Sequence, residues 1–267
     1  MTHRARILFV DDVKEVLDGL AGSVWRYRKK WNATFALGGA SAVTEMRNAP
    51  FDVIVTDMRM PTVDGEAVLN ATASCSPSTI RIILSGQIDR AVAMRTTSIA
   101  HRFLSKPCSI DELYECVDEV LRVATAMDAD MRSLVCGVGH LPIAMHTTAR
   151  SNEGQSPDHL AAIVTRDAGL AAHLLHVASS GFFAKRQRVT NPRDAVTILG
   201  NETVRMLIRA ITITSSFATE WNADTMDETV GRIAMSTRPG SPLDHVAVGR
   251  NLLALWGITP GFVRAPA

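Results

Sequence analysis

The sequence predicts an open, parallel α/β sheet followed by an all-α region, and two observations lead to this fold class. In the first part of the chain, short apolar runs alternate with segments of helical periodicity, which is typical of βαβ units. From Met131 onward, apolar residues recur at helical spacing only. A length of 267 residues suits two domains better than one.

Four apolar runs in the first part each lead to a polar residue at their carboxyl end. In chain order these are Asp11 with Asp12 after RILFV, Asp57 after FDVIVT, Ser85 after RIIL and Lys106 after HRFLS. In a parallel sheet the carboxyl ends of the strands share one edge, where ligands bind. We therefore expect carboxylates, a hydroxyl and an ammonium group to converge at this edge.

These residue types suit phosphoryl transfer assisted by a divalent cation. Clustered carboxylates repel one another unless a cation neutralises them, and hard oxygen ligands favour Mg²⁺ over zinc or copper. Asp57 would be the nucleophile, and Asp11 and Asp12 would hold the metal together with it. Ser85 and Lys106 would each bind an oxygen of the phosphoryl group. Taken singly, each aspartate could instead be an ordinary acid at a helix start or in a loop. The occurrence of all these residues together, in this order along the chain, favours a phosphoryl-transfer site.

Residues 1–122 resemble a response-regulator receiver domain of two-component signalling. The residues that carry the resemblance are Asp11-Asp12, Asp57 in DMRMP, Gly65, Ser85-Gly86 and Lys106-Pro107. The resemblance implies a five-stranded, flavodoxin-like parallel sheet that accepts a phosphoryl group on Asp57 from a sensor histidine kinase or phosphotransfer protein. It further implies a need for Mg²⁺ and a cis peptide before Pro107.

The same resemblance places Phe103 at the family's aromatic switch position, with Ser85 as its hydroxyl partner. Phosphorylation would draw Ser85 inward and the ring would follow, although core packing alone is an alternative role for Phe103. The only chemistry expected of the chain is phosphorylation and dephosphorylation of Asp57, so it is predicted to be a signalling protein and not an enzyme.

Helix signals surround these runs. The segment after Asp12 carries apolar residues on one helical face and ends in a basic stretch, Arg26 to Lys30, which we interpret as a solvated helix end. Ser109 with Glu112 predicts a capping box for the last helix of the first domain. We expect a helical linker over residues 123–132 and a second domain over residues 133–267.

In the second domain, helix starts are predicted at Ser156-Pro157, Asn191-Pro192 and Ser241-Pro242, because proline is favoured directly after an N-cap residue. Asp167 predicts a further N-cap. Helix ends are predicted at the glycines of this region, which are Gly181, Gly200 and Gly257.

This region is similar to an HDOD domain, a helical relative of the HD phosphohydrolases. The similar segments are Leu141-Pro142, IVTRDAGLAAHLLHVASSGFF, VTNPRDAVTILGNETVRMLI and HVAVGRNLLALWGITP, which include Phe182, Phe183 and Pro260. The stretch from Ser216 to Ser241 replaces a longer internal block of the family pattern, and we expect no counterpart of the family's closing helix, which would follow Ala267. A shortened domain would leave an apolar face exposed unless a second subunit or a partner covers it, so we expect either self-association, for example as a homodimer, or marginal stability.

The resemblance implies a non-catalytic output domain that contacts a downstream protein. A metal-dependent hydrolase acting on a cyclic dinucleotide is the first alternative. It is opposed by the absence of a His-Asp dipeptide from the sequence, where Asp244-His245 is reversed. The other histidines do not complete the set of metal ligands that such a hydrolase needs, although His173 and His176 share a helical face. In the second domain these other histidines are His140, His146, His159, His173 and His176.

A DNA-binding regulator is the second alternative, but its candidate helices, Lys185 to Arg188 and Arg205 to Arg209, are thinly basic or too apolar. The net charge of +1 likewise gives no electrostatic reason to expect nucleic acid or a membrane surface as partner. Without a membrane-length apolar run or a secretory signal, we expect a cytoplasmic protein. Four cysteines without metal-ligand spacing are interpreted as structural.

Overall fold

The structure is a computed structural model that describes residues 4–86, 96, 98–138, 141, 156–180, 189–214, 226–236 and 241–258. The chain divides into two compact units. The first comprises Met1–Ile88 and Ile99–Gly137, and the second comprises Asp89–Ser98 and Val138–Ala267. Each unit is described by itself below.

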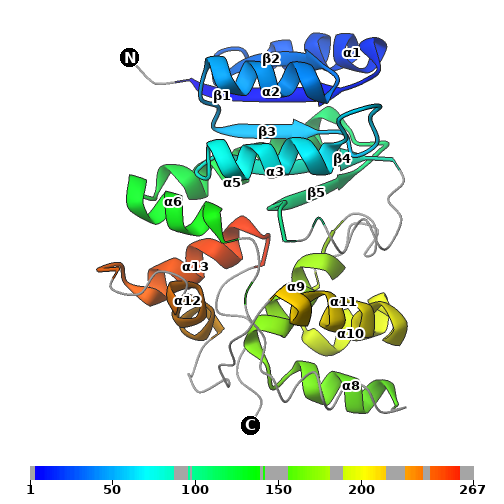
Figure 1. Cartoon of the computed structure of the whole chain (residues 1–267), viewed down its shortest axis with the longest axis vertical. Coiled ribbons are helices and arrows are strands. Elements are labelled where there is room, and N and C mark those ends of the chain that lie inside the picture. Colours follow the sequence, from blue (N-terminus) through cyan, green and yellow to red (C-terminus); the bar gives the residue numbers. More distant parts are fainter. Residues whose placement is uncertain are drawn as a thin grey trace. The chain divides into compact units, whose positions relative to one another are not determined.

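The first unit contains a parallel five-stranded sheet in the order β2-β1-β3-β4-β5 (Figure 1). Its strands are β1 (Ala5–Asp11), β2 (Trp31–Leu37), β3 (Val53–Thr56), β4 (Ile80–Ser85) and β5 (Arg102–Ser105). The predicted α/β fold is therefore confirmed. Every residue of β3 and β4 is buried, as expected of central parallel strands that are covered on both faces.

Helices cover both faces of this sheet. They are α1 (Lys14–Val24), α2 (Gly39–Asn48), α3 (Gly65–Cys75) and α5 (Ile110–Thr125), with a short 3₁₀ helix, η1 (Trp25–Tyr27), after α1. Helices α1 and α5 pack together, as do α2 and α3. The strand order reverses between β1 and β3, the switch point at which open α/β sheets bind ligands.

The last two helices of the first unit follow β5. The predicted capping box begins α5: Ser109 Oγ accepts from Glu112 N at 3.2 Å, and Glu112 Oε2 accepts from Ser109 N at 2.8 Å. After a break at residues 126–128, helix α6 (Ala129–Gly137) follows, and it belongs to the first unit. Hydrogen bonds of the Arg132 side chain and of the Cys136 carbonyl attach α6 to the amino ends of strands.

The described part of the second unit is helical, as predicted. Its helices are α8 (Pro157–Val164), α9 (Ala168–Ala178), α10 (Pro192–Leu199), α11 (Asn201–Thr214), α12 (Met226–Ser236) and α13 (His245–Leu255). Ser156, Asn191 and Asp167 are N-caps whose side chains accept backbone N–H groups, which confirms three predicted starts. Gly200 and Gly257 follow helix ends with φ of 77° and 82°.

One predicted helix start is wrong. Ser241-Pro242 lies in irregular chain, and α13 begins at His245 with Asp244 as its N-cap. Asp244 accepts from two backbone N–H groups, those of Val246 and Ala247, so a carboxylate cap replaces the expected serine.

Several sequence predictions fall outside the described residues. They concern His140, Pro142, His146, Gly181, Phe182, Phe183, Lys185 to Arg188 and Pro260. In the described ranges, no single helix has the length and apolar character of a membrane span. Helices α8 and α9 reach that length and apolar character only together, and the pair is bent by 115°.

Candidate functional site

Asp11 and Asp57 lie side by side at the carboxyl edge of the sheet. Val10 of β1 pairs with Thr56 of β3. Asp11 follows Val10 as the last residue of β1, and Asp57 follows Thr56 directly after the end of β3. The N–H of Asp57 donates to Val10 O at 2.8 Å, which extends the ladder to the site. The register of two neighbouring strands therefore brings these two acids together, as the sequence predicted.

Lys106, which follows β5, reaches across to both acids. Its Nζ donates to Asp11 Oδ2 and to Asp57 Oδ1, each at 2.7 Å. The side chains of Asp11 and Asp57 are only 5% and 10% exposed and that of Lys106 is 28% exposed, so both ion pairs are largely shielded from water. Burial alone lowers the pKa of Lys106, but the two hydrogen-bonded carboxylates outweigh burial and raise it, which keeps the ammonium group charged.

The second oxygen of each acid is held by a backbone amide. Asp57 Oδ2 accepts from Arg59 N at 2.6 Å, and Asp11 Oδ1 accepts from Val13 N at 3.0 Å. Each carboxylate thus has one oxygen on the main chain and the other on Lys106. This arrangement fixes the orientation of both side chains, and no residue pattern marks the two amides in advance.

Gly65 is needed for the chain to turn back behind Asp57. Its N–H donates to Met58 O at 3.1 Å, and a Cβ at this position would lie 2.2 Å from Asp57 O. Any side chain here would displace the backbone that carries the acid. The spacing between Asp57 and Gly65 therefore has a steric origin.

Ser85 and Phe103 are both buried near this edge, with exposures of 2% and 7%. Ser85 ends β4, and its carbonyl accepts from Lys106 N at 2.9 Å. Phe103 is in register with Ile83 on the neighbouring strand. The Lys106-Pro107 peptide is cis, as predicted.

Asp12 is exposed, whereas Asp11 and Asp57 are buried. Within the ranges that the structure describes, no group of three or more His, Cys, Asp and Glu side chains could hold a metal ion. Two of the three predicted metal-binding carboxylates therefore meet, and Asp12 does not join them. The chemistry of the pair still fits Mg²⁺: the oxygens are hard ligands, and the two neighbouring carboxylates, Asp11 and Asp57, exceed the charge of the one lysine between them.

In the second unit, His173 and His176 are buried side chains of α9. His173 Nε2 accepts from Leu141 N at 2.8 Å, and His176 Nδ1 lies 3.2 Å from Trp256 O. Both rings lie against the Trp256 indole, with centroids 5.3 and 5.0 Å away. Their shared helical face is thus explained by contacts with Leu141 and Trp256.

Comparison with known proteins matches two families. The response regulator receiver domain matches residues 7–118, and the HDOD domain matches residues 143–232. The chain is 28% identical over 119 residues to an uncharacterized transcriptional regulatory protein, YesN, of Bacillus subtilis (strain 168), covering 43% of this chain and 32% of the relative. It is 26% identical over 195 residues to the transcriptional regulatory protein ZraR of Escherichia coli (strain K12), covering 67% and 42%.

These relatives are longer proteins, and the chain spans less than half of the length of each. Among solved structures, the signal receiver domain of an HD domain-containing protein from Pseudomonas fluorescens Pf-5 is 24% identical, with a TM-score of 0.44. This match covers 47% of the present chain and 100% of the other.

Proposed function

We propose that this chain, a two-component response regulator that joins a receiver domain to an HDOD domain, accepts a phosphoryl group on Asp57 and transmits the change through its HDOD half. The donor would be a sensor histidine kinase or a phosphotransfer protein.

The observation that carries this proposal is the shared position of Lys106. Its Nζ lies 2.7 Å from both Asp11 and Asp57, at the carboxyl edge of the sheet. A nucleophilic carboxylate needs a neighbouring cation, because the incoming phosphoryl group is itself negatively charged. Lys106 supplies that cation. Among the described residues its ammonium group donates to the side chains of Asp11 and Asp57 and to no backbone group, so it can move with a phosphoryl oxygen.

The proposed reaction is phosphoryl transfer between side chains. A carboxylate oxygen of Asp57 attacks phosphorus, and the P–N bond of a partner's phosphohistidine breaks as the O–P bond forms. The electron pair of the broken bond returns to the imidazole, which takes up a proton from solvent. Lys106 then donates to one phosphoryl oxygen and Ser85 Oγ to another.

Mg²⁺, when bound, would supply positive charge against the phosphoryl oxygens. Asp11 and Asp57 would hold it, and Asp12 is the third acid near enough in sequence to contribute. The amides of Val13 and Arg59 keep the first two carboxylates oriented for this task.

For the HDOD half we propose a non-catalytic role in contacting a downstream protein or a second copy of the chain. The packing of His173 and His176 on Trp256 and on backbone groups supports a structural role for these histidines over metal binding. Helix α11, the described candidate for DNA recognition, buries Val204, Leu207 and Ile208, which favours a core position.

The test is labelling by a small-molecule phosphodonor in Mg²⁺, followed by intact mass. The wild-type chain should gain one phosphoryl group, and Asp57→Asn should gain none. Asp64→Asn is the matched control, because Asp64 is an exposed N-cap and asparagine caps a helix equally well. Undiminished labelling of Asp57→Asn would refute the assignment.

A further inference from the structure

Arg81 is an unusual residue for the interior of a sheet. It is 1% exposed, and its guanidinium donates to three carbonyl oxygens: Ile99 at 2.6 Å, Thr79 at 3.1 Å and Cys136 at 2.7 Å. Burial lowers its pKa to about 10. Within the described part of the chain, no carboxylate pairs with it. A buried cation of this kind must be stabilised by its acceptors, so these contacts are specific.

One of these acceptors belongs to a different element from the others. Cys136 lies in the last turn of α6, where carbonyl groups lack helical partners and carry partial negative charge. His101 Nε2 lies 3.1 Å from the same carbonyl and 3.2 Å from Arg81 Nη2. The end of α6 is thereby attached to Arg81 of β4 and to His101, which precedes β5.

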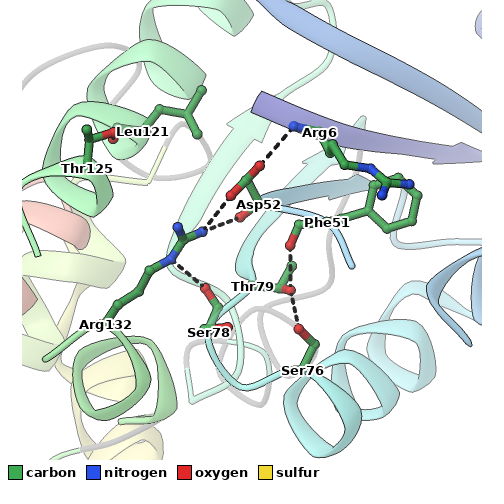
Figure 2. Close-up of polar contacts among 9 residues, drawn as sticks. All are labelled: Arg6, Phe51, Asp52, Ser76, Ser78, Thr79, Leu121, Thr125 and Arg132. Atoms are coloured by element: carbon green, nitrogen blue, oxygen red, sulfur yellow. Dashed lines mark hydrogen bonds and ion pairs between the residues drawn. The ribbon is translucent and has the colours of Figure 1, made fainter. Parts of the chain in front are cut away.

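The other end of α6 is attached through Arg132 (Figure 2). Arg132 Nε donates to Ser78 O at 3.1 Å, and its Nη2 donates to Asp52 Oδ1 at 3.2 Å. The other oxygen of Asp52 accepts from Arg6 N of β1 at 2.9 Å. Helix α6 is therefore fixed to the amino edge of the sheet at both ends.

A continuous row of buried side chains joins this edge to the Asp57 site. Because side chains alternate along a strand, Arg81, Ile83 and Ser85 share one face of β4. By the register of the pair, His101 and Phe103 lie on the same face beside Arg81 and Ile83. All five are buried, with exposures of 7% or less. A shift of Ser85 and Phe103 would therefore change the packing around Arg81 and His101.

We propose that this row couples phosphorylation of Asp57 to the attachment of α6, with Arg81 as the positioning residue. Helix α6 is the last element of the first unit, and the second unit begins again at Val138. A change in how firmly Cys136 O is held would thus reach the HDOD half through the chain itself. The inference rests on the proposed function, because it needs Asp57 to be the phosphorylated residue.

Hydrogen exchange of the full chain tests the coupling, with beryllofluoride and Mg²⁺ as the phosphoryl mimic. In the wild type, the mimic should change exchange both around Asp57 and in α6. In Arg81→Gln, the response around Asp57 should remain while the response of α6 is lost. Arg122→Gln is the control, because that α5 side chain is 72% exposed. An α6 response in Arg81→Gln as large as in the wild type overturns the proposal.

A second variant covers the case in which Arg81→Gln does not fold. Arg132 is partly exposed, so Arg132→Gln removes the other attachment at lower structural cost. Linkage is reciprocal, so loosening α6 should alter the affinity for beryllofluoride by about fivefold or more. If Arg132→Gln binds beryllofluoride with wild-type affinity, the coupling is overturned and the proposed function is not. The same holds if the mimic changes hydrogen exchange of the wild type around Asp57 but not in α6. A wild type that responds nowhere overturns the proposed function as well.

Discussion

Lys106 and Asp57 form an ion pair, Nζ to Oδ1 at 2.7 Å, that joins residues 49 positions apart in the chain. The same ammonium group holds Asp11 of β1, so one side chain connects the ends of three strands. Because the pairs are largely shielded from water, their geometry is a property of the folded receiver and not of a mobile surface. Removal of this lysine should therefore have consequences beyond a lost charge.

We predict that Lys106→Ala leaves metal binding largely intact but uncouples phosphorylation from any change in oligomeric state. The acids remain to bind Mg²⁺, whereas no ammonium group is left to follow the phosphoryl oxygens. Calorimetric titration with Mg²⁺ and light scattering before and after addition of a phosphodonor measure the two properties. Lys14→Ala, which removes an exposed i,i+4 pair with Asp18, is the control. An oligomeric response that persists in Lys106→Ala would count against the assigned role.

The raised pKa of Lys106 predicts a loss of stability at alkaline pH. Burial opposes the charged form, but Asp11 and Asp57 overcome it, so the pKa of the folded state lies above the ordinary value of 10.5. The stabilisation is therefore complete below pH 10.5 and disappears as the pH rises through the pKa of the folded state. Urea unfolding below and above this pH measures the loss.

Other groups titrate in the same range, so the informative quantity is the difference between the wild type and Lys106→Met. The variant lacks the titrating ammonium group and should show a smaller alkaline decrease in the free energy of unfolding. If both proteins lose stability with the same dependence on pH, the ion pairs do not provide this stabilisation.

Gly65→Ala should destabilise the receiver and displace Asp57. The added Cβ would lie 2.2 Å from Asp57 O and 2.9 Å from Met58 Cα, and backbone cannot rotate away as a side chain can. We expect a loss of about 1–3 kcal/mol, the usual cost of overpacking, together with slower labelling of Asp57. Gly19→Ala is the matched control: its Cβ meets nothing within 4 Å, and alanine favours the helix there. Equal effects of the two changes would contradict the steric explanation.

The meeting of Asp11, Asp57 and Lys106 could be predicted from the sequence because each follows an apolar run, and parallel strands place such residues at one edge. It did not locate β2, whose mixture of buried and exposed residues gives neither a continuous apolar run nor a strict alternation. Ser241-Pro242 resembled a helix start, but Asp244 forms the cap, because local motifs compete and tertiary packing selects among them.

The attachment of α6 also lay beyond sequence reasoning. Arginines are usually exposed, so sequence reasoning interprets Arg81 as a polar residue at the start of a strand. Its acceptors are backbone carbonyl groups, which no residue pattern marks. Only the folded chain brings Cys136 O to the guanidinium from 55 residues away.

The crossing of α12 and α13 provides a prediction for the second unit. A Cβ on Gly231 would lie 1.7 Å from His245 O, and a Cβ on Gly249 would lie 1.8 Å from Asp227 O. The two helices therefore touch through their backbones, and Gly231→Ala or Gly249→Ala must separate them. We expect each change to lower the free energy of unfolding by about 1–3 kcal/mol or more.

The double variant distinguishes this crossing from two unrelated effects. One outward movement of α13 relieves both clashes, so Gly231→Ala with Gly249→Ala should cost less than the sum of the single changes. Urea unfolding followed by the helical circular dichroism signal measures all three variants, with Gly19→Ala at an exposed position of α1 as reference. Wild-type stability in either single variant, or strictly additive losses, would mean that the helices do not meet at these glycines.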